Sequence, residues 1–497
     1  MGRSFGVGRG SIWCFEPVLL TGQPERLTRL RLDLGEVFAE LTHFISLTRK
    51  EITMPKARKR YVGLDVHKNV VEYCILDSEG KKLDGGNFIC EQSVLVNFAK
   101  KVLSLNDQVA LETTTSTWTV VDILEPFVDK IVVSNPLKTK IIAEAKVKTD
   151  KVDAMILAQL LRCDFLPAVW IPDKKTRELR RISSFRKSLV QEATATKNRI
   201  KGILNHLLIK HAVAWTKQGL EELKSVALPP VERIIMDTEI AVLQHQELQI
   251  EKVELEIQKL AYAEDNIRLL MTIPSVGYNT ASALLAVFGD ISRFKDADHA
   301  ASYLGLVPIV KKSADTCYYG PITKTGSSLA RGMLCEAAQT LFKNDGPLGV
   351  FIRRVRDKKG GGKAVVAGAR KLATLAYHIL KNKEPYRYAT VSSTREKLRI
   401  LRKKAGGAKL PPQQYHRDEE MQRNRPEGVH AVRYVPPLAD VYKNEGLPPA
   451  LTFAELSSGE QRVLKEMGVA EKIRANEKVA IIALPKKATT PPQQSGK

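Results

Sequence analysis

Residues 61–68 of the chain are Tyr-Val-Gly-Leu-Asp-Val-His-Lys, an apolar run that carries one acidic residue, Asp65. The residues from Val71 to Ile75 then alternate between apolar and polar types, up to a polar turn at 77–80. An apolar run followed by alternation and a turn is typical of a β-hairpin. We therefore expect two antiparallel strands, with Asp65 at the end of the first.

Further elements follow the hairpin in a regular order. Apolar runs predict three more strands, and stretches with helical periodicity separate them. The expected elements are a strand at 82–89, a helix at 93–105, a strand at 109–111 that ends at Glu112, a second helix, a strand at 130–133 and an amphipathic helix that begins at Asp150. Three strands, helix, strand, helix, strand, helix is the order of an α/β ribonuclease H-like domain.

Four acidic residues, Asp65, Glu112, Asp150 and Asp153, fall at the ends of two central strands and at the start of one helix. Asp150 and Asp153 are three residues apart and so share one helix face. Hard divalent cations prefer carboxylate oxygens, and two ions about 4 Å apart can stabilise both oxygens of a phosphodiester displacement. The order therefore predicts a polynucleotide site that binds Mg²⁺ or Mn²⁺, although each acid alone is more readily explained as a helix cap or a solvated residue.

Two blocks of sequence resemble one known family. The motifs GLDVHK, ET, SNP and KTDKVDA around the four acids are similar to those of the DEDD transposases of the insertion-sequence-110 family, relatives of the Piv DNA invertase. A second block resembles the carboxy-terminal transposase domain of the same family. That block comprises residues 270–289, 301–308 and 322–338, and the two blocks together cover 57–386. The resemblance implies a RuvC-like catalytic domain and a transposase or site-specific recombinase that cuts and rejoins DNA.

The resemblance also implies a serine nucleophile shortly after the GLxP segment. The matching residue here is Ser313, five positions beyond Pro308, and Ser327 and Ser328 are alternatives. A serine hydroxyl needs activation by a base or a metal, which the family provides at the DEDD acids, from the same or another protomer. Residues 314–319, Ala-Asp-Thr-Cys-Tyr-Tyr, depart from the small, Gly-rich stretch that is usual after this serine.

Composition limits the class of protein. A formal charge of +23 over 497 residues favours a polyanionic partner, and 43 % hydrophobic residues provide for buried cores. The six cysteines form no CxxC pair, which fits a reducing compartment. No apolar stretch approaches a membrane span, and a secretory signal is absent. We expect a soluble, cytoplasmic protein, and the resemblance places it with the nucleoid of a prokaryotic cell.

Basic residues on helical spacing mark 176–208. Such a run is commonly a solvated helix face, but in a basic chain with a nuclease-like site it favours contact with phosphates. Residues from this run and from the stretch 311–331 are the predicted nucleic-acid contacts: Arg177, Arg180, Arg181, Arg186, Lys311, Lys312, Lys324 and Arg331.

The stretch 231–261 is nearly free of Gly and Pro, with Ile250, Val253, Ile257 and Leu260 on 3-4-3 spacing. This pattern predicts either a coiled-coil arm or an antiparallel helix pair. The resemblance favours a coiled coil that joins a homodimer or a tetramer. It further implies donor and target DNA as partners, and a non-coding RNA from the element's flank as a guide.

The predicted organisation has five parts. They are an extension at 1–56, with Met54 a plausible start; the DEDD domain at 57–175; a basic helical and coiled-coil linker at 176–265; the carboxy-terminal transposase domain at 266–386, with a helix-hairpin-helix-like turn at 273–277; and a tail at 387–497. Proline pairs and polar residues predict that the tail is mostly disordered, with a short helix at 453–474.

Three other functions remain open from the sequence. A junction-resolving nuclease would use the same acids without a serine. An actin-like kinase or ATPase also begins with a strand ending in Gly-x-Asp, but the chain has no convincing second phosphate loop. An inactive DNA-binding descendant of a transposase would show no strand transfer.

Overall fold

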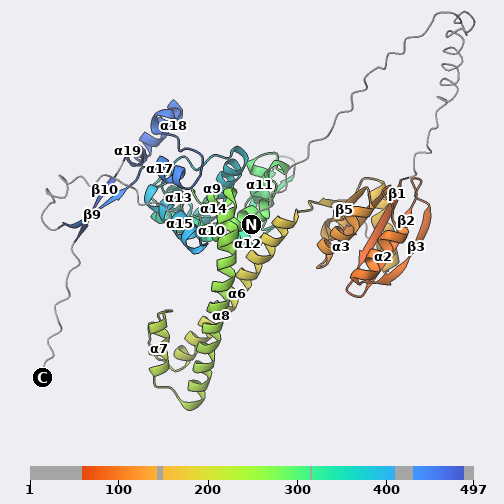
Figure 1. Cartoon of the computed structure of the whole chain (residues 1–497), viewed down its shortest axis with the longest axis horizontal. Coiled ribbons are helices and arrows are strands. Elements are labelled where there is room, and N and C mark those ends of the chain that lie inside the picture. The colour runs from red at the N-terminus through yellow and green to blue at the C-terminus, as the bar shows by residue number, and fades with distance from the viewer. Residues whose placement is uncertain (1–58, 143–148, 314–315, 409–428, 479, 486–497) are drawn as a thin grey trace, which may run out of the picture. The chain divides into compact units, whose positions relative to one another are not determined.

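The computed structural model describes residues 59–142, 149–313, 316–408, 429–478 and 480–485 (Figure 1). The chain divides into two compact units, of which the first ends at Ile171 and the second begins at Pro172. None of the helices in these ranges combines the length and the apolar character needed to span a membrane. The predicted extension, with Met54, lies outside the described residues.

The first unit contains a six-stranded mixed sheet, formed by β1 (Arg60–Val66), β2 (Val70–Leu76), β3 (Lys82–Ile89), β4 (Asp107–Glu112), β5 (Lys130–Ser134) and β6 (Ala168–Val169). The strand order is β3-β2-β1-β4-β5-β6. β1 pairs antiparallel with β2 and parallel with β4, which pairs parallel with β5. The five predicted strands are confirmed, and their order is consistent with a ribonuclease H-like domain. β6 was not predicted because a two-residue strand carries no periodicity.

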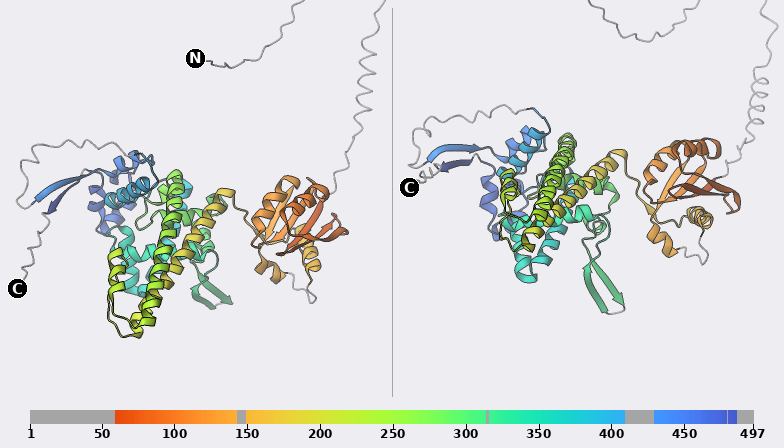
Figure 2. Two further views of the ribbon diagram at one scale, coloured as in Figure 1. Left: turned by 60° about the horizontal axis from the view of Figure 1, so that its bottom comes forward. Right: turned by 90° about the horizontal axis from the view of Figure 1, so that it is seen from below.

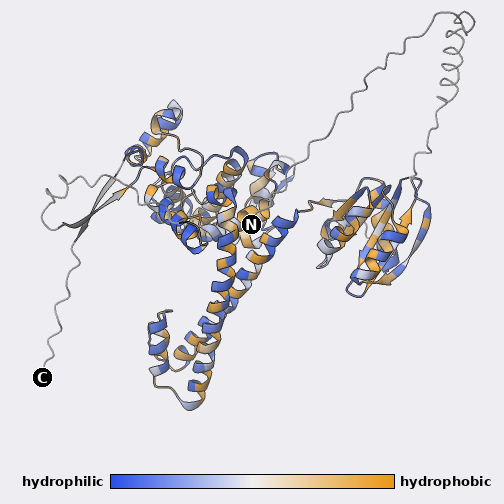
Figure 3. Cartoon of the chain, in the orientation of Figure 1, coloured by the Kyte–Doolittle hydropathy of each residue, from blue (hydrophilic) through white to orange (hydrophobic). Residues whose placement is uncertain are grey.

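Helices cover both faces of this sheet. The helices of the first unit are α2 (Gln92–Val102), α3 (Thr117–Leu124), α4 (Pro136–Ile142) and α5 (Asp150–Arg162). Leu95 of α2 and Val120 of α3 join Leu64 in the core on one face. On the other face, Leu157 of α5 packs with Ala110. Apolar residues therefore run along the central strands (Figure 3), as expected for strands that are buried on both sides.

Gly63 determines how closely α5 approaches β1. A Cβ atom at this position would lie 1.9 Å from the carbonyl oxygen of Ala154 and 2.7 Å from the backbone nitrogen of Ala158. Both are backbone atoms of α5, so they cannot move aside unless the helix shifts. Glycine at this position therefore lets α5 lie directly against the strand that carries Asp65.

Two long helices open the second unit. They are α6 (Lys174–His206) and α8 (Pro230–Ala263), and α7 (Lys217–Ser225) lies between them in the chain. Ion pairs connect Arg186 to Glu254 and Arg199 to Glu239. The arginine that comes later in α6 pairs with the glutamate that comes earlier in α8. The two helices are therefore antiparallel.

The apolar seam of α8 packs within the same chain. Ile240 and Leu243 are at most 1 % exposed and share a core with Ile200 of α6. Leu260, which belongs to the 3-4-3 pattern of the sequence, is 40 % exposed, and Leu248 is 49 % exposed. The antiparallel helix pair, one of the two alternatives from the sequence, is confirmed. The dimerising coiled coil stays a prediction.

The body of the second unit is mainly helical. It comprises α9 (Asp265–Leu270), α10 (Tyr278–Phe288), α11 (Ala297–Tyr303), α12 (Ser328–Thr340), α13 (Pro347–Lys359), α14 (Gly361–Asn382) and a hairpin of β7 (Pro308–Ser313) and β8 (Thr316–Ile322). The predicted helix-hairpin-helix-like segment corresponds to α9, a turn and α10. Ser275 adopts a φ of 65° in this turn, a left-handed conformation that bends the chain sharply.

The prediction of a mostly disordered tail is wrong for the described residues beyond 387. These residues form α15 (Val391–Lys404), α17 (Leu438–Asn444), α18 (Ser458–Glu466) and α19 (Ala470–Ala475), while β9 (Val429–Val435) pairs with β10 (Ala480–Pro485). Leu398, Leu401 and Tyr442 are at most 1 % exposed and belong to the core of the second unit. Short helices between the prolines thus supply enough apolar residues to extend an existing core. Residues 409–428 and 486–497 lie outside the description.

Candidate active site

The four predicted acids lie on one face of the sheet of the first unit. Side chains alternate along a strand, so Asp65 shares the face of Gly63, and Glu112 shares the face of Ala110. Gly63 contacts α5 directly, and Ala110 packs in the core that α5 covers. β1 and β4 are parallel neighbours in which Leu64 pairs with the residue before Glu112. Asp65 and Glu112 therefore lie at matching positions of neighbouring strands, on the face of the sheet that α5 covers.

The other two acids come from the first turn of α5. Thr149 caps this helix, because its side chain accepts a hydrogen bond from the backbone nitrogen of Val152. Asp150 and Asp153 then occupy the first turn, where carboxylates interact favourably with the exposed N–H groups. A local capping sequence thus explains why the helix begins here, and the contact at Gly63 places its start beside β1.

A compact group of ligand atoms joins Asp65, Asp150 and a histidine that was not predicted, His67. His67 Nε2 lies 3.0 Å from Asp65 Oδ2 and 3.4 Å from Asp150 Oδ1. One ligand atom from each of the three residues lies within 4.8 Å of the others. Two of the four predicted acids are therefore brought together directly, while Glu112 and Asp153 lie on the same face.

The electrostatics of this group favour a bound cation. Burial raises the pKa of the Asp65 carboxyl, His67 opposes that rise, and the charges of Asp153 and Asp150 add to it. Desolvation lowers the pKa of His67, but the Asp65 and Asp150 carboxylates outweigh it and leave the pKa above its ordinary value. Crowded carboxylates repel one another unless positive charge neutralises them. Carboxylate oxygens with one imidazole form a suitable ligand set for a divalent cation.

Sequence reasoning missed His67 and also Glu72. His67 belongs to the GLDVHK motif, in which the pattern of acidic ligands marks only Asp65. Glu72 is the direct cross-strand partner of Asp65, is 8 % exposed and accepts a hydrogen bond of 2.8 Å from Asn87 Nδ2. Alternation along β2 did not mark Glu72 as a site residue, because the pattern alone does not show that α5 covers the second face of the sheet. The signal that could have found Glu72 is its register opposite Asp65.

Ser313 is the last residue of β7 and is exposed, next to residues 314 and 315, which are not described. The two alternative serines have structural partners in the second unit. Ser327 caps α12 by accepting from the backbone nitrogen of Ala330 at 3.3 Å. Ser328 Oγ accepts a hydrogen bond of 3.2 Å from Lys187 Nζ. Of the three serines, Ser313 is the one for which these contacts define no structural role.

Several predicted nucleic-acid contacts have partners within the protein. Arg180 donates to the carbonyl oxygens of Ala286 and Val287 at the end of α10. Arg186 pairs with Glu254. Arg331 likewise donates to two backbone carbonyls, and Arg177 is half-buried. The remaining four predicted contacts are exposed: Arg181, Lys311, Lys312 and Lys324.

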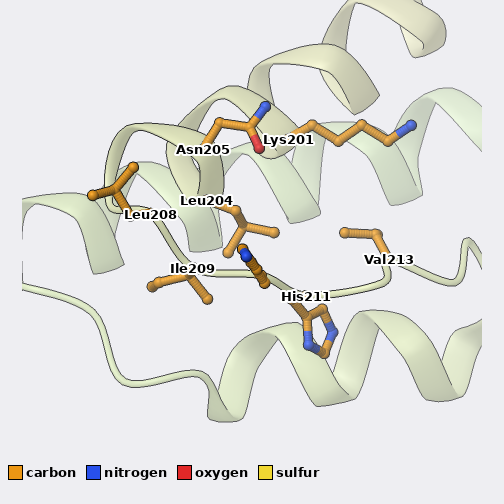
Figure 4. Close-up of a pocket in the computed structure, with 8 residues that line it drawn as sticks. Lys201, Leu204, Asn205, Leu208, Ile209, His211 and Val213 are labelled. Atoms are coloured by element: carbon orange, nitrogen blue, oxygen red, sulfur yellow. The ribbon is translucent and has the colours of Figure 1, made fainter.

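A cavity of about 370 Å³ lies at the end of α6 in the second unit (Figure 4). Leu204, Ile209 and Val213 give it apolar walls, and Lys201 and His211 stand at its margin. Lys201 also lies over the ring of Trp215, at 5.7 Å from its centroid. No acidic residue lines this cavity, so it lacks the ligands expected of the predicted metal site.

Two stretches of the chain match known protein families. Residues 62–209 match the family model of DEDD transposases of the IS110 type. Residues 267–348 match the transposases of the IS116/IS110/IS902 family. The first match extends beyond the sheet and through the basic helix α6, and the second includes the β7–β8 hairpin.

Similar proteins are known in several bacteria. The chain is 26 % identical over 250 residues to the transposase for insertion sequence element IS1111A of Coxiella burnetii, which covers 48 % of this chain and 68 % of that protein. It is 26 % identical over 288 residues to an uncharacterized 43.6 kDa protein of insertion element IS110 in Streptomyces coelicolor, covering 47 % and 71 %. It is also 26 % identical over 268 residues to the pilin gene-inverting protein of Moraxella lacunata, covering 52 % and 74 %.

Proposed function

We propose that this chain, whose residues 62–209 and 267–348 match transposase models of the IS110 type, cuts and rejoins the DNA of an insertion sequence with a metal site and a serine nucleophile. The observation that carries the proposal is the group formed by Asp65, His67 and Asp150, whose ligand atoms lie within 4.8 Å of one another. Glu112 and Asp153 share its face of the sheet and complete the proposed set of four acids.

The proposed cofactor is Mg²⁺ or Mn²⁺, held by the carboxylates of Asp65, Glu112, Asp150 and Asp153. When bound, such ions polarise a phosphate and stabilise the entering and leaving oxygens of an in-line displacement. The chain's own part is to hold the carboxylates in place before substrate arrives. Asp65 is held by a buried strand, and the two aspartates of α5 are held by the helix cap and by the close contact at Gly63.

Ser313 is the proposed nucleophile. Its Oγ would bond to the scissile phosphorus while the bond from phosphorus to one deoxyribose oxygen breaks, and the serine proton would pass to solvent or to the leaving oxygen. The new phosphoserine ester keeps the energy of the phosphodiester. A hydroxyl group of another strand can then attack phosphorus and release the serine, so the strands are rejoined without ATP.

The proposed partners are donor DNA, target DNA and a guide RNA from the flank of the element. The exposed side chains of Arg181, Lys311, Lys312 and Lys324 are the proposed phosphate contacts. An excess of 23 positive charges favours such polyanions. Homology to transposases supports the DNA partners, and the RNA is proposed from the family resemblance alone.

A homo-oligomer through α8 is the proposed assembly, as a dimer or a tetramer. Ile234, Leu248 and Leu255 are 69 %, 49 % and 43 % exposed. With Ala241 they lie seven residues apart along α8, which matches one of the two apolar positions in each heptad of a coiled coil. This second seam is separate from the residues that pack on α6, so it supports a coiled coil between chains in addition to the helix pair within one chain.

We propose five functional segments within the two compact units. They are an extension (1–56), the DEDD domain (57–175), the basic helical and coiled-coil linker (176–265), the transposase domain (266–386) and the C-terminal segment (387–497). The catalytic acids and the proposed nucleophile thus belong to different segments. A reaction that needs both should fail when either segment is altered.

The main competing function is a junction-resolving nuclease that uses the acids with water in place of serine. It would cut DNA but form no covalent protein–DNA species. An inactive DNA-binding descendant would do neither, and an actin-like ATPase would bind ATP. The three alternatives therefore differ in observable products.

The decisive experiment incubates the protein with Mg²⁺, flanking DNA of the element and its transcript, and separates the products on a denaturing gel. We expect rejoined strands and a protein-linked band that Ser313→Ala lacks. Ser327→Ala is the matched control, because Ser327 is a helix cap. If the band persists in Ser313→Ala but disappears in Ser327→Ala or Ser328→Ala, the nucleophile is wrongly assigned. Cleavage without any linked band would favour the nuclease.

A further inference from the structure

The β7–β8 hairpin exposes aromatic side chains that the core of the second unit does not use. Tyr318 and Tyr319 are 61 % and 67 % exposed, and Val310 is 52 % exposed. Figure 2 shows the hairpin, in dark green, projecting from the helices of its unit. An isolated two-stranded hairpin is marginally stable in water. A ribbon with large exposed rings on both sides is therefore suited to a partner that covers at least one face.

The register of the hairpin separates its side chains into two faces. Lys311 pairs with Tyr318, and Ser313 pairs with Thr316. Direct cross-strand partners point to the same side, and alternate residues along a strand also share a side. One face therefore carries Ser313, Lys311 and Tyr318, and we call it the serine face.

The opposite face carries Tyr319, which pairs with Val310, and Cys317, which pairs with Lys312. The two tyrosines are adjacent in sequence and similarly exposed, but they point in opposite directions. Among the described residues of the hairpin, 308–313 and 316–322, none is acidic. The positive charge of both faces thus favours an anionic partner. The two faces differ because the Tyr318 ring and the Lys311 ammonium group share the face of Ser313.

We propose that the serine face holds a DNA strand with unpaired bases, with the Tyr318 ring stacked on a base and the Lys311 ammonium group on a phosphate. The proposal rests on the role of Ser313 proposed above and adds the residues that present the strand to it. Lys311 and Ser313 are alternate residues of one strand, so their side chains stand roughly 7 Å apart. A strand bound along the ribbon would therefore meet a cation, a ring and the hydroxyl group together.

Unpaired DNA fits this face better than duplex DNA does. A ring stacks on a base only when the base has left its own stack, and such stacking tolerates any base because every base has a flat face. A strand that is opened for exchange supplies these bases. The phosphates of the same strand supply the negative charge that Lys311 can neutralise.

The test compares Tyr318→Ala with Tyr319→Ala in the full-length protein. The probes are a fluorescein-labelled single-stranded oligothymidylate and a strand of equal length with abasic sites. We expect Tyr318→Ala to weaken oligothymidylate binding about 10-fold. We expect Tyr319→Ala to change it less than about 2-fold. Tyr318→Phe should restore binding because it keeps the ring. The abasic strand should bind wild type and Tyr318→Ala alike, because it offers phosphates without bases.

The Lys311→Gln variant tests the phosphate contact separately. It should reduce the slope of log affinity against log salt by about 0.7, the value for one contact with a single strand. This change should appear with both probes, since both keep their phosphates. An unchanged slope would mean that Lys311 makes no phosphate contact in the complex.

Equal losses in the two tyrosine variants, or a loss on the abasic strand, would overturn the proposal, because neither result requires stacking on the serine face. A loss confined to single-stranded oligouridylate would overturn it in favour of RNA. The serine-linked product is measured in the same preparations. If wild type forms no such product but Tyr318→Ala still loses binding, the nucleophile fails and the proposed face stands. If the product forms and the tyrosines are equivalent, the proposed face fails alone.

Discussion

The sheet of the first unit and the C-terminal segment from Val391 onward are held together by different interactions. In the sheet, Asp65 stands between the buried Leu64 and Val66, and backbone contact at Gly63 fixes the neighbouring helix. In the C-terminal segment, polar side chains anchor short helices, as in the buried ion pair of Arg402 with Glu445. Apolar close packing leaves the Asp65 carboxylate at the proposed metal site, whereas Asp107 of the same sheet pairs with Arg60. In the C-terminal segment, charged groups have become part of the structure.

The largest expected effect is a loss of activity without a loss of stability. Asp65→Asn should reduce strand cleavage at least about 1000-fold, equivalent to about 4 kcal/mol in the barrier, because a neutral amide holds a divalent cation poorly. Its melting temperature should equal or exceed that of the wild type, since the change removes charge repulsion. Asp129→Asn, at an exposed aspartate of the same unit, is the control. Full cleavage by Asp65→Asn would exclude Asp65 from the site.

A second prediction concerns close packing. Gly63→Ala should lower the free energy of unfolding of the first unit by about 3 kcal/mol, because its methyl group would collide with the backbone of α5. Gly320→Ala is the matched control in the β7–β8 hairpin, where the nearest atom to an added Cβ is 3.5 Å away. It should change stability by less than about 0.5 kcal/mol. Denaturant unfolding measures both, and equal effects would show that α5 tolerates displacement from β1.

The same contrast explains what the sequence could predict. Alternation from Val71 to Ile75 and the apolar runs around Asp65 predict strands because each pattern is local and repeats over several residues. His67 and Glu72 were missed because their roles depend on register and on a helix far along the chain. The sequence therefore predicted the four acids of the candidate site but not the neighbouring residues His67 and Glu72.

Apart from the helical stretch predicted at 453–474, where α18 and most of α19 lie, the C-terminal segment escaped prediction for a related reason. Its helices are short, and proline pairs lie between them, so no single stretch carries a long periodic pattern. Leu398 and Tyr442 become core residues only because the second unit offers them an apolar surface. Its composition indicates that the segment has too few apolar residues to fold alone. Composition does not indicate whether another part of the chain completes its core.

A third prediction tests a polar anchor. Lys397 of α15 donates from its ammonium group to the carbonyl oxygens of Met271, Ile273 and Val276, around the turn before α10. Lys397→Met keeps much of the side-chain volume but removes all three donors, so it should cost about 2 kcal/mol of stability. Lys403→Met, at an exposed position of the same helix, should be nearly neutral in chemical denaturation. Equal stability of the two variants would mean that water replaces the ammonium group at these carbonyls.

The smallest predicted effect is a pH dependence in the same segment. Glu460 of α18 accepts hydrogen bonds from Ser457 Oγ at 2.9 Å and from the Tyr388 hydroxyl at 2.9 Å, and it pairs with Arg387 at 3.0 Å. The Ser457 and Tyr388 bonds are the main cause that lowers the pKa of Glu460 to about 2, from 4.5 for an unperturbed glutamate. The side chain is 30 % exposed, so solvent screening reduces the contribution to about 1 kcal/mol.

The direction of this pH effect follows from proton binding. Between pH 4.5 and about 2 the unfolded chain binds a proton at Glu460 that the folded chain does not, so the stabilisation is complete above pH 4.5 and is lost as the pH falls towards 2. Glu460→Gln should therefore melt below the wild type at pH 6, and the difference should shrink steadily as the pH falls from 5 to 3. Tyr388→Phe removes one of the hydrogen bonds and should show a smaller difference with the same trend. A constant difference across this range would mean that Glu460 acts by packing, and that the C-terminal segment is held in the same way as the sheet.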